Sequence, residues 1–292
     1  MKPVDFDYVR PGSLGEVCAA LREAGEDGKI IAGGQTLVPL LAMRLARPRL
    51  VIDINGITEL QGIESHDDAI VLRACTRQAA ALADDKVRRR VPLLAKALRF
   101  VGHVQTRHRG TIGGSLANAD PAAEIGLAAT ALGATVTARS TSGERPIAMT
   151  QFFRGAMETA LAAEECLSAV SFPVWRDGRI GTGFQEVSAR RSDFALAAAA
   201  VQLALDEGGI CRRATLAIGG AGAMPLAIDV AAQRLVGSRL ADADLADAAG
   251  IAEAAIAASG DANGSALYRR RVAGELARRA LAEARDELAG HA

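Results

Sequence analysis

Two glycine-rich runs are the stretches of this chain whose residue types and spacing fit a recognisable chemistry. They cover residues 30–37 and 110–117, and each combines adjacent glycines with apolar neighbours and a small hydroxyl residue, Thr36 or Ser115. Glycine lets a backbone approach a phosphate closely and donate its N–H groups to it. Two such runs predict a diphosphate held from two sides, which points to a dinucleotide cofactor rather than to a metal or a nucleophilic triad.

Either run alone has a simpler explanation, because paired glycines also serve tight turns and close packing. The interpretation depends on the two runs together, since both lie in the first half of the chain and can face each other across a cleft. The first run lacks the G-x-G-x-x-G spacing of a Rossmann turn.

The composition excludes several classes of function. The chain has 292 residues, half of them hydrophobic, which suffices for two or more domains. A formal net charge of zero gives no long-range attraction to nucleic acid or to an anionic membrane. The sequence has neither a signal-peptide core nor an apolar stretch long enough to span a membrane, so we expect a cytoplasmic protein. Its scattered cysteines have no zinc or iron–sulfur spacing and are expected to be free core thiols.

The elements around the first run follow a β–loop–α–β order. Ser13 and Glu16 have the spacing of a capping box, which predicts that a helix begins there. A strand is expected at 29–32, a helix at 36–45 and a short buried strand at 50–53. A helix therefore begins directly after the first glycine pair.

The second run lies between further expected elements. A strand is expected at 70–74, Thr76 is expected to cap the next helix, and another helix covers 92–101. Asp120 followed by proline is the order that begins a helix, and a strand returns at 134–139.

The last third of the chain has a different character. A linker is expected at 173–179, and the apolar runs 194–205 and 211–219 are separated by a hairpin signal. The alanine-rich segments 241–258 and 265–288 have helical periodicity. These elements predict a small α+β domain.

With these elements placed, the sequence resembles the medium, FAD-binding subunit of the molybdenum hydroxylases, the family of xanthine dehydrogenase and aerobic carbon monoxide dehydrogenase. The likeness extends over essentially the whole chain, and the paired loops at this separation are its most specific part. It rests on residues 32–40, 102–119 and 120–124, more faintly on 184–187 and 190–195, and on 266–271 followed by a helix.

The resemblance implies an α+β fold in two domains. Residues 1–175 would form a two-part α/β FAD-binding domain of the PCMH or vanillyl-alcohol-oxidase-like type, with subdomains at about 1–55 and 56–175. Residues 176–292 would form the C-terminal α+β domain of the flavoprotein subunit.

The resemblance also implies which residues contact FAD. The first run would surround the pyrophosphate with backbone N–H groups, and the second would contact it from the other side. Phe194 would cover the isoalloxazine ring, Gln185 stands where some family members have lysine, and Glu124 aligns with an acidic position near FAD. Asp120 fits a helix cap and a cofactor contact equally well. The implied contacts are Ala32, Gly33, Gly34, Gln35, Thr36, Leu37, Val101, Thr111, Gly113, Gly114, Ser115, Glu124, Leu167, Gln185 and Phe194.

The implied complex divides the chemistry among subunits. A large subunit would oxidise the substrate at a molybdopterin-type molybdenum cofactor, and a small subunit with [2Fe-2S] clusters would pass electrons to FAD in this chain, in a dimer of heterotrimers. The chain itself would hold no metal and no catalytic acid or base, and its role would be to bind and tune the flavin. Two alternatives stay open: a stand-alone FAD-dependent oxidase or dehydrogenase, and a non-catalytic nucleotide-binding assembly module.

The remaining charged motifs have ordinary explanations. His103 and His108 flank the second run and are either solvated or close to the cofactor, whereas His66 and His291 are expected on the surface. The arginine triplets at 88–90 and 269–271 are expected to be solvated helix faces, with docking of a partner subunit as the alternative.

Overall fold

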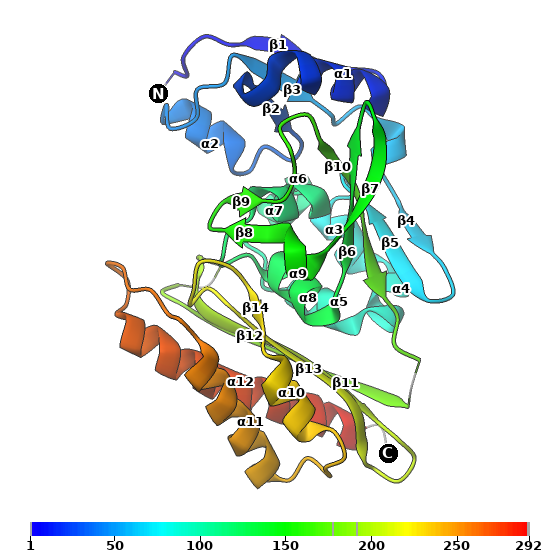
Figure 1. Cartoon of the computed structure of the whole chain (residues 1–292), viewed down its shortest axis with the longest axis vertical. Helices are drawn as coiled ribbons and strands as arrows, with labels where there is room; N and C mark the ends of the chain where they lie inside the picture. Colours follow the sequence, from blue (N-terminus) through cyan, green and yellow to red (C-terminus); the bar gives the residue numbers. More distant parts are fainter. Residues whose placement is uncertain (1, 177, 191, 291–292) are drawn as a thin grey trace.

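The computed structural model describes residues 2–176, 178–190 and 192–290. Three main sheets follow one another along the long axis of the molecule (Figure 1). A three-stranded sheet lies at the N-terminal end, a five-stranded sheet in the middle, and a four-stranded sheet covered by helices at the C-terminal end. The predicted α+β class is confirmed. Asp177 of the expected linker, Arg191 of the fainter sequence match and His291 lie outside the described residues.

The N-terminal sheet is parallel and has the strand order β1-β3-β2. Its elements confirm the predicted β–loop–α–β order, and the first glycine run connects β2 to α2. The elements are β1 (Asp7–Val9), α1 (Leu14–Ala24), the 3-10 turn η1 (Gly25–Asp27), β2 (Gly28–Ile31), α2 (Leu37–Ala42) and β3 (Leu50–Asp53).

Helix α1 begins where the sequence predicts, although only half of the capping box forms. The Ser13 hydroxyl accepts a hydrogen bond from the Glu16 N–H at 3.2 Å, but the Glu16 carboxylate accepts from the Gly12 N–H at 2.7 Å instead of from Ser13. Helix α2 is shorter than the expected 36–45, because the chain leaves the helical region at Arg44, whose φ is 61°.

The middle sheet is antiparallel and has the strand order β4-β5-β10-β6-β7. Short helices connect β5 to β6, and a two-stranded hairpin follows the edge strand β7. The elements are η2 (Thr58–Leu60), β4 (Ile63–Ser65), β5 (Ala69–Arg73), α3 (Gln78–Ala83), α4 (Asp85–Arg90), α5 (Pro92–Ala97), α6 (Val104–Arg109), α7 (Ile112–Asn118), α8 (Glu124–Leu132), β6 (Thr135–Ser140), β7 (Gly143–Ala148), α9 (Met149–Phe152), β8 (Phe153–Gly155), β9 (Glu158–Thr159) and β10 (Cys166–Pro173).

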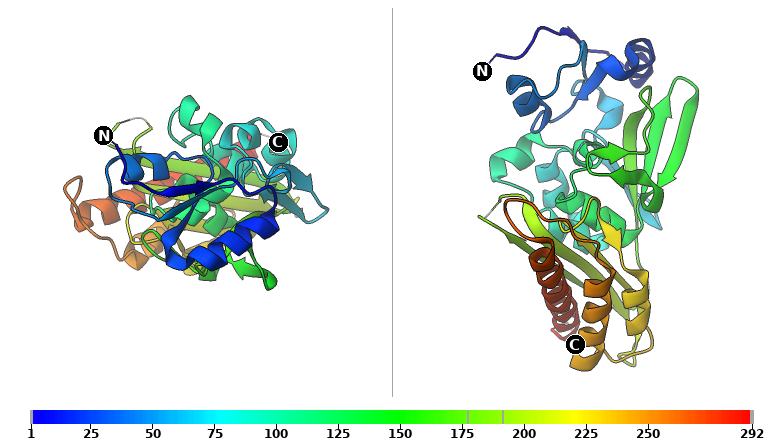
Figure 2. Two further views of the ribbon diagram at one scale, coloured as in Figure 1. Left: turned by 90° about the horizontal axis from the view of Figure 1, so that it is seen from above. Right: turned by 60° about the vertical axis from the view of Figure 1, so that its left-hand side comes forward.

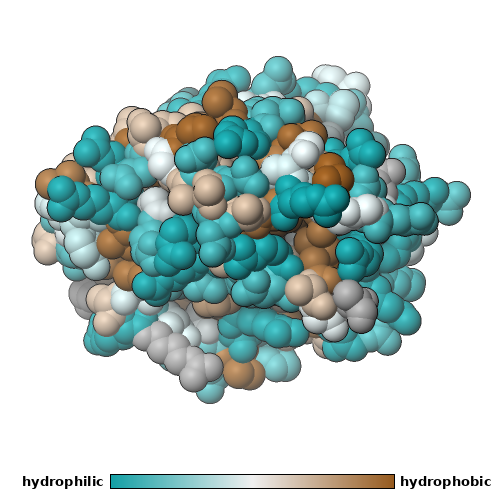
Figure 3. Space-filling model, turned by 90° about the horizontal axis from the view of Figure 1, so that it is seen from below, coloured by the Kyte–Doolittle hydropathy of each residue, from teal (hydrophilic) through white to brown (hydrophobic). Residues whose placement is uncertain are grey.

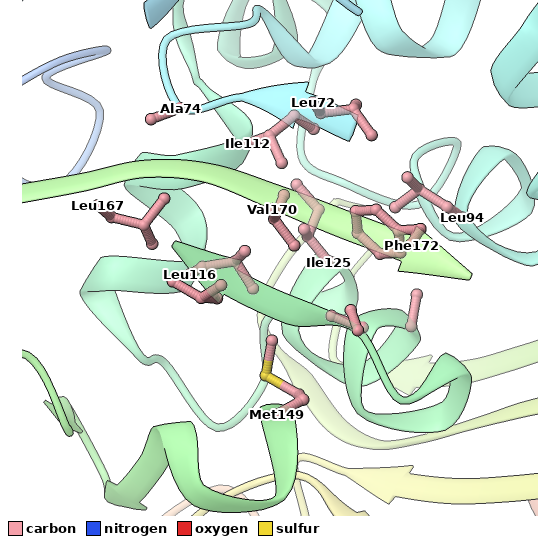
Figure 4. Packing of buried hydrophobic residues seen from close by; sticks show 14 of the residues in the cluster. Leu72, Ala74, Leu94, Ile112, Leu116, Ile125, Met149, Leu167, Val170 and Phe172 are labelled. Atoms are coloured by element: carbon pink, nitrogen blue, oxygen red, sulfur yellow. The ribbon is translucent and has the colours of Figure 1, made fainter. Parts of the chain in front are cut away.

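The main hydrophobic core holds the second glycine run against this sheet. Ile112 and Leu116 of α7 pack with Leu72 of β5, Val170 of β10 and Ile125 of α8 (Figure 4). All five side chains are fully buried. A helix as short as α7 is marginal on its own, so its position depends on this apolar packing.

Two predicted helix caps are wrong. Thr76 does not cap α3, because its hydroxyl donates to the carbonyl of Gly62 at 2.8 Å. Asp120 does not cap α8, because its carboxylate accepts from the N–H of Ala122 at 2.9 Å in a turn that precedes the helix. Short polar side chains form such local turns as readily as they cap helices, which explains both errors.

The C-terminal sheet is antiparallel, and its elements confirm the predicted hairpin and helices. Strands β12 and β13 pair directly, with Leu203 opposite Ala214. Helix α12 begins after Ser265, whose hydroxyl accepts from the Tyr268 N–H at 3.2 Å. The elements are β11 (Arg179–Ser188), β12 (Ala195–Leu205), β13 (Cys211–Gly219), β14 (Leu226–Ala227), α10 (Asp229–Leu235), α11 (Asp242–Ala255) and α12 (Ala266–Ala289).

Strand β12 is buried on both faces. Ala198 and Ala200 belong to the main core, whereas Ala197, Ala199 and Val201 belong to a second cluster beneath the helices. Helices α10, α11 and α12 lie together on that second side of the sheet (Figure 2). A strand between two layers is apolar on both faces, which explains why its sequence does not alternate.

The arginine run at 269–271 departs from its expected exposure. Arg269 is only 7% exposed, donates to the carbonyls of Leu196 and Gly220 at 3.0 and 2.9 Å, and pairs with Asp261 at 2.6 Å. The prediction of a solvated face is therefore wrong for Arg269.

The C-terminal face of the molecule shows hydrophobic residues scattered among hydrophilic ones (Figure 3). The four cysteines are buried and free, as predicted.

Candidate functional site

The two glycine runs touch each other in the folded chain. A Cβ atom on Gly33 would lie 2.5 Å from the carbonyl oxygen of Arg109 and 2.9 Å from the Cα of Gly110. Real Cβ atoms essentially never come so close to backbone atoms, so only glycine fits at residue 33. The fold therefore brings runs 30–37 and 110–117 together at one place, between the N-terminal and middle sheets.

The first run leaves a row of backbone donors free. Among the described residues, the N–H groups from Gly33 to Leu37 donate no hydrogen bond. The carbonyls turn the other way: Ala32 accepts from Asn55 Nδ2 at 2.7 Å and Gly33 from Gln35 Nε2 at 3.2 Å. Successive free N–H groups form an anion-binding concavity, so this run fits a diphosphate.

The second run uses most of its donors inside the protein. The N–H groups of Ile112 and Gly113 donate to the carbonyls of Thr76 and Ala74 at 3.0 and 2.9 Å. The Gly114 N–H donates to the Thr111 hydroxyl at 3.0 Å. Gly113 also packs closely, since a Cβ there would lie 2.6 Å from that of Ala74.

The second run nevertheless keeps some polar groups without a protein partner. In the described part of the chain, the Thr111 N–H and the Ser115 hydroxyl make no hydrogen bond. The observed role of Gly113 and Gly114 is close packing, and their contact with a cofactor stays a prediction.

A pair of acidic side chains lies at the junction of the middle and C-terminal parts. Burial raises the pKa of Glu124, the first residue of α8, to about 7, and nearby Asp120 raises it further while Arg107 opposes the rise. Burial also raises the pKa of Glu186 on β11 to about 8, with a further contribution from Glu124. Two carboxyl groups that influence each other and are partly protonated near neutral pH are typical of functional sites.

Glu186 is a residue that the sequence interpretation missed. Its Oε2 atom is buried, and no hydrogen-bond partner lies near it among the described residues. Strand alternation was the available signal, because residues two apart share a face. Phe184 packs on Phe100 of the middle part, with ring centroids 4.9 Å apart, so Glu186 faces the same side.

Comparison with known protein families decides between the possible cofactors. Residues 4–175 match the model of the FAD binding domain in molybdopterin dehydrogenase, and residues 182–284 match that of the CO dehydrogenase flavoprotein C-terminal domain. The chain belongs to the FAD-binding medium subunits of the molybdopterin dehydrogenases. The predicted two-part FAD-binding domain followed by a C-terminal α+β domain is confirmed for this medium subunit, as is its class as an oxidoreductase subunit.

Individual relatives match over nearly their full length. The medium subunit is 39% identical to the 6-hydroxypseudooxynicotine dehydrogenase complex subunit alpha of Paenarthrobacter nicotinovorans, over 97% of this chain and 96% of that protein. It superposes on a chain of reconstituted CO dehydrogenase from Oligotropha carboxidovorans with a TM-score of 0.95 and 34% identity, covering 98% and 100% of the two chains. For quinoline 2-oxidoreductase from Pseudomonas putida 86 the TM-score is 0.92 and the identity 35%, with 98% and 99% covered.

The other predicted contacts of the medium subunit lie in different environments. Val101 and Leu167 are buried. The side chain of Gln185 donates to the Glu283 carboxylate of α12 at 2.8 Å and so points toward the C-terminal helices. Phe194 is 71% exposed, which leaves its ring free to cover a ligand. These assignments to FAD stay predictions.

The histidines of the described chain are peripheral. His66, His103 and His108 are exposed. His66 lies 3.5 Å from Glu64, on the strand that precedes it. No helix among the described residues is long and apolar enough to cross a membrane.

Proposed function

We propose that this medium subunit is the FAD-carrying electron-transfer component of a molybdenum hydroxylase complex. The observation that carries the proposal is the row of free N–H groups from Gly33 to Leu37, set against the second glycine run. Five successive N–H groups without a partner among the described residues suit the diphosphate of FAD without the help of a lysine.

The residues of the chain divide the binding task. The first run holds the diphosphate, and the Thr111 N–H and the Ser115 hydroxyl approach it from the other side. Phe194 shields one face of the ring, and Glu124 and Val101 line its surroundings. The bound flavin supplies a redox centre that accepts electrons and passes them on, whereas the protein binds, orients and tunes it.

The electrons would come from partner subunits. We propose a small [2Fe-2S] subunit and a large subunit with a molybdopterin-type cofactor, assembled with this chain as a dimer of heterotrimers. The names of the relatives, which are subunits or medium chains of dehydrogenase complexes, support this division. A domain boundary at residues 175 and 176 is part of the proposal, supported by the two family models, which match residues 4–175 and 182–284. The cytoplasmic location stays a prediction.

A flavin measurement tests the proposal directly. The purified complex is expected to be yellow and to release FAD on denaturation. Gly33→Val is expected to abolish FAD binding, because its side chain would collide with the Arg109 carbonyl. Gly250→Val is the matched control, since Gly250 lies in open space on α11. Full FAD occupancy in Gly33→Val would contradict the loop assignment.

Anaerobic reduction separates the electron-transfer subunit from its rivals. Bleaching of the flavin only when substrate is added to the whole complex supports the proposal. Bleaching of the isolated chain by substrate would identify a stand-alone oxidase or dehydrogenase, and absence of flavin would leave a nucleotide-binding module. Metal analysis of the complex is expected to find molybdenum and iron that stay with the partners when this chain is separated.

A further inference from the structure

A network of polar side chains connects the two glycine runs beneath the site. Asn55 follows β3, and its Nδ2 donates to the carbonyl of Ala32 at 2.7 Å. Its Oδ1 accepts from Nη2 of Arg77 at 2.7 Å. The other terminal nitrogen of Arg77 donates to the carbonyl of Arg109. One asparagine and one arginine thus join both runs, although no sequence motif singles out either residue.

The two carbonyls in this network flank the point where the runs touch. The Arg109 oxygen is the atom closest to Gly33, and the Ala32 carbonyl belongs to the peptide bond that carries the Gly33 N–H. In a trans peptide the C=O and N–H groups point in opposite directions. Asn55 therefore turns the Gly33 N–H away from itself, toward the open side of the loop. Gln35 has the same effect on the Gly34 N–H by binding the Gly33 carbonyl.

Asn55 is itself held firmly by the N-terminal sheet. Oδ1 of Asp53 accepts from the backbone N–H of Asn55 at 2.9 Å and from its Nδ2 at 2.7 Å. The other oxygen of Asp53 accepts from the Tyr8 hydroxyl at 2.5 Å. Side chains fixed in this way present groups in one direction, which is how a supporting layer orients the groups that bind a ligand.

We propose that Asn55 and Arg77 are positioning residues for the diphosphate of FAD, a role that rests on the proposed function. Asn55 fixes the direction in which the first run presents its N–H groups. Arg77 brings the second run against it, and its planar guanidinium binds Asn55 and the Arg109 carbonyl together. Lysine cannot reproduce this geometry, because its three N–H donors all belong to one nitrogen atom and do not form a planar fork.

The test compares FAD binding and the diphosphate signal in matched variants. The flavin-free full chain, with any partner subunits that copurify, is titrated with FAD. Asn55→Ala and Arg77→Met are each expected to weaken FAD binding about tenfold, the effect of losing a hydrogen bond to a charged or fixed polar group. Because both belong to one network, the double variant is expected to lose less than the product of the single effects.

The matched control is Arg73→Met. Arg73 ends strand β5, just before the connection that carries Arg77, and its guanidinium binds only Glu64 among the described residues. Its FAD affinity is expected to equal that of the wild type. Arg77→Lys keeps the positive charge and is expected to weaken FAD binding nearly as much as Arg77→Met. Because Arg77→Lys is the milder substitution, its FAD affinity can still be compared with that of the wild type if Arg77→Met fails to fold.

A phosphorus NMR spectrum at saturating FAD separates positioning from general stability. The diphosphate resonances of bound FAD are expected to shift in Asn55→Ala and Arg77→Lys and to stay unchanged in Arg73→Met. Weaker binding with unshifted resonances would overturn the proposal, because the network would then stabilise the fold without orienting the diphosphate. Unchanged affinity would overturn it as well. If the wild-type chain failed to bind FAD at all, the proposed function itself would be wrong.

Discussion

The wild-type protein is expected to become less stable as the pH rises, because Glu186 is buried. Replacing Glu186 by glutamine is expected to remove this contribution to the pH dependence. Burial raises the pKa of the Glu186 carboxyl to about 8, and Glu124, whose own pKa burial raises to about 7, contributes to the rise. In the unfolded chain the same carboxyl titrates near its ordinary value of 4.5. Between pH 4.5 and about 8, the Glu186 carboxyl therefore keeps its proton in the folded protein and loses it in the unfolded chain.

The sign and size of the effect follow from this difference. Below pH 4.5 both states carry the proton, so ionisation costs the folded state nothing. As the pH rises toward about 8, only the unfolded chain ionises, and the free energy of unfolding falls. The full difference amounts to about 5 kcal/mol at about 1.4 kcal/mol for each pH unit, and partial exposure of the side chain reduces it to about 2 kcal/mol.

Urea unfolding of the flavin-free chain at about pH 5 and about pH 8.5 measures the effect. Glu186→Gln is expected to match the wild type at the lower pH and to be about 2 kcal/mol more stable at the higher one. Glu207→Gln, in the exposed turn between β12 and β13, is the control and is expected to match the wild type at both. Equal pH dependence of Glu186→Gln and the wild type would refute the reasoning, because the buried carboxyl would then ionise normally.

Two further predictions concern the packing that supports the site. Gly113→Ala is expected to destabilise the fold by about 2 kcal/mol, because the added methyl group meets backbone and Cβ atoms of Ala74, and thermal unfolding measures the loss. A stability equal to that of Gly250→Ala would contradict the close packing of α7. Arg269→Met is expected to cost about 3 kcal/mol, because it removes a buried guanidinium and leaves the partly buried carbonyls of Leu196 and Gly220 without their donor. A loss no larger than that of the exposed Arg270→Met, in the same unfolding assay, would show that these bonds add little.

Local signals allowed much of the fold to be predicted. The β12–β13 hairpin is marked by turn residues between two apolar runs, and α1 and α12 begin at serine caps, features that depend only on neighbouring residues. Thr76 and Asp120 have the same local chemistry and do not cap helices. Their side chains choose between a cap and a turn according to tertiary contacts that no short segment of sequence contains.

The supporting residues of the site could not be predicted in this way. Asn55, Arg77 and Arg109 meet through contacts between residues 22 and 32 positions apart, and nothing periodic connects them. Arg269 belongs to a charged triplet in the sequence, yet its side chain is buried where it donates to backbone carbonyls that are distant in the sequence. The position of Glu186 could have been predicted, because neighbouring residues of β11 point to opposite faces of the sheet. The side chain of Gln185 faces α12, so that of Glu186 faces the other way.

The two glycine runs resemble each other in sequence but solve different physical problems. In the first run the N–H groups from Gly33 to Leu37 make no hydrogen bond within the described part of the chain, which leaves them free to donate to a ligand. In the second run Gly113 and Gly114 donate within the protein, and the missing side chain of Gly113 allows α7 to lie against the chain at Ala74. One run therefore supplies the binding groups and the other the surface that holds them in place. Apart from Gly33, where a Cβ atom would meet the backbone at Arg109, a substitution in the first run is expected to affect FAD before stability, and one in the second run to affect stability before FAD.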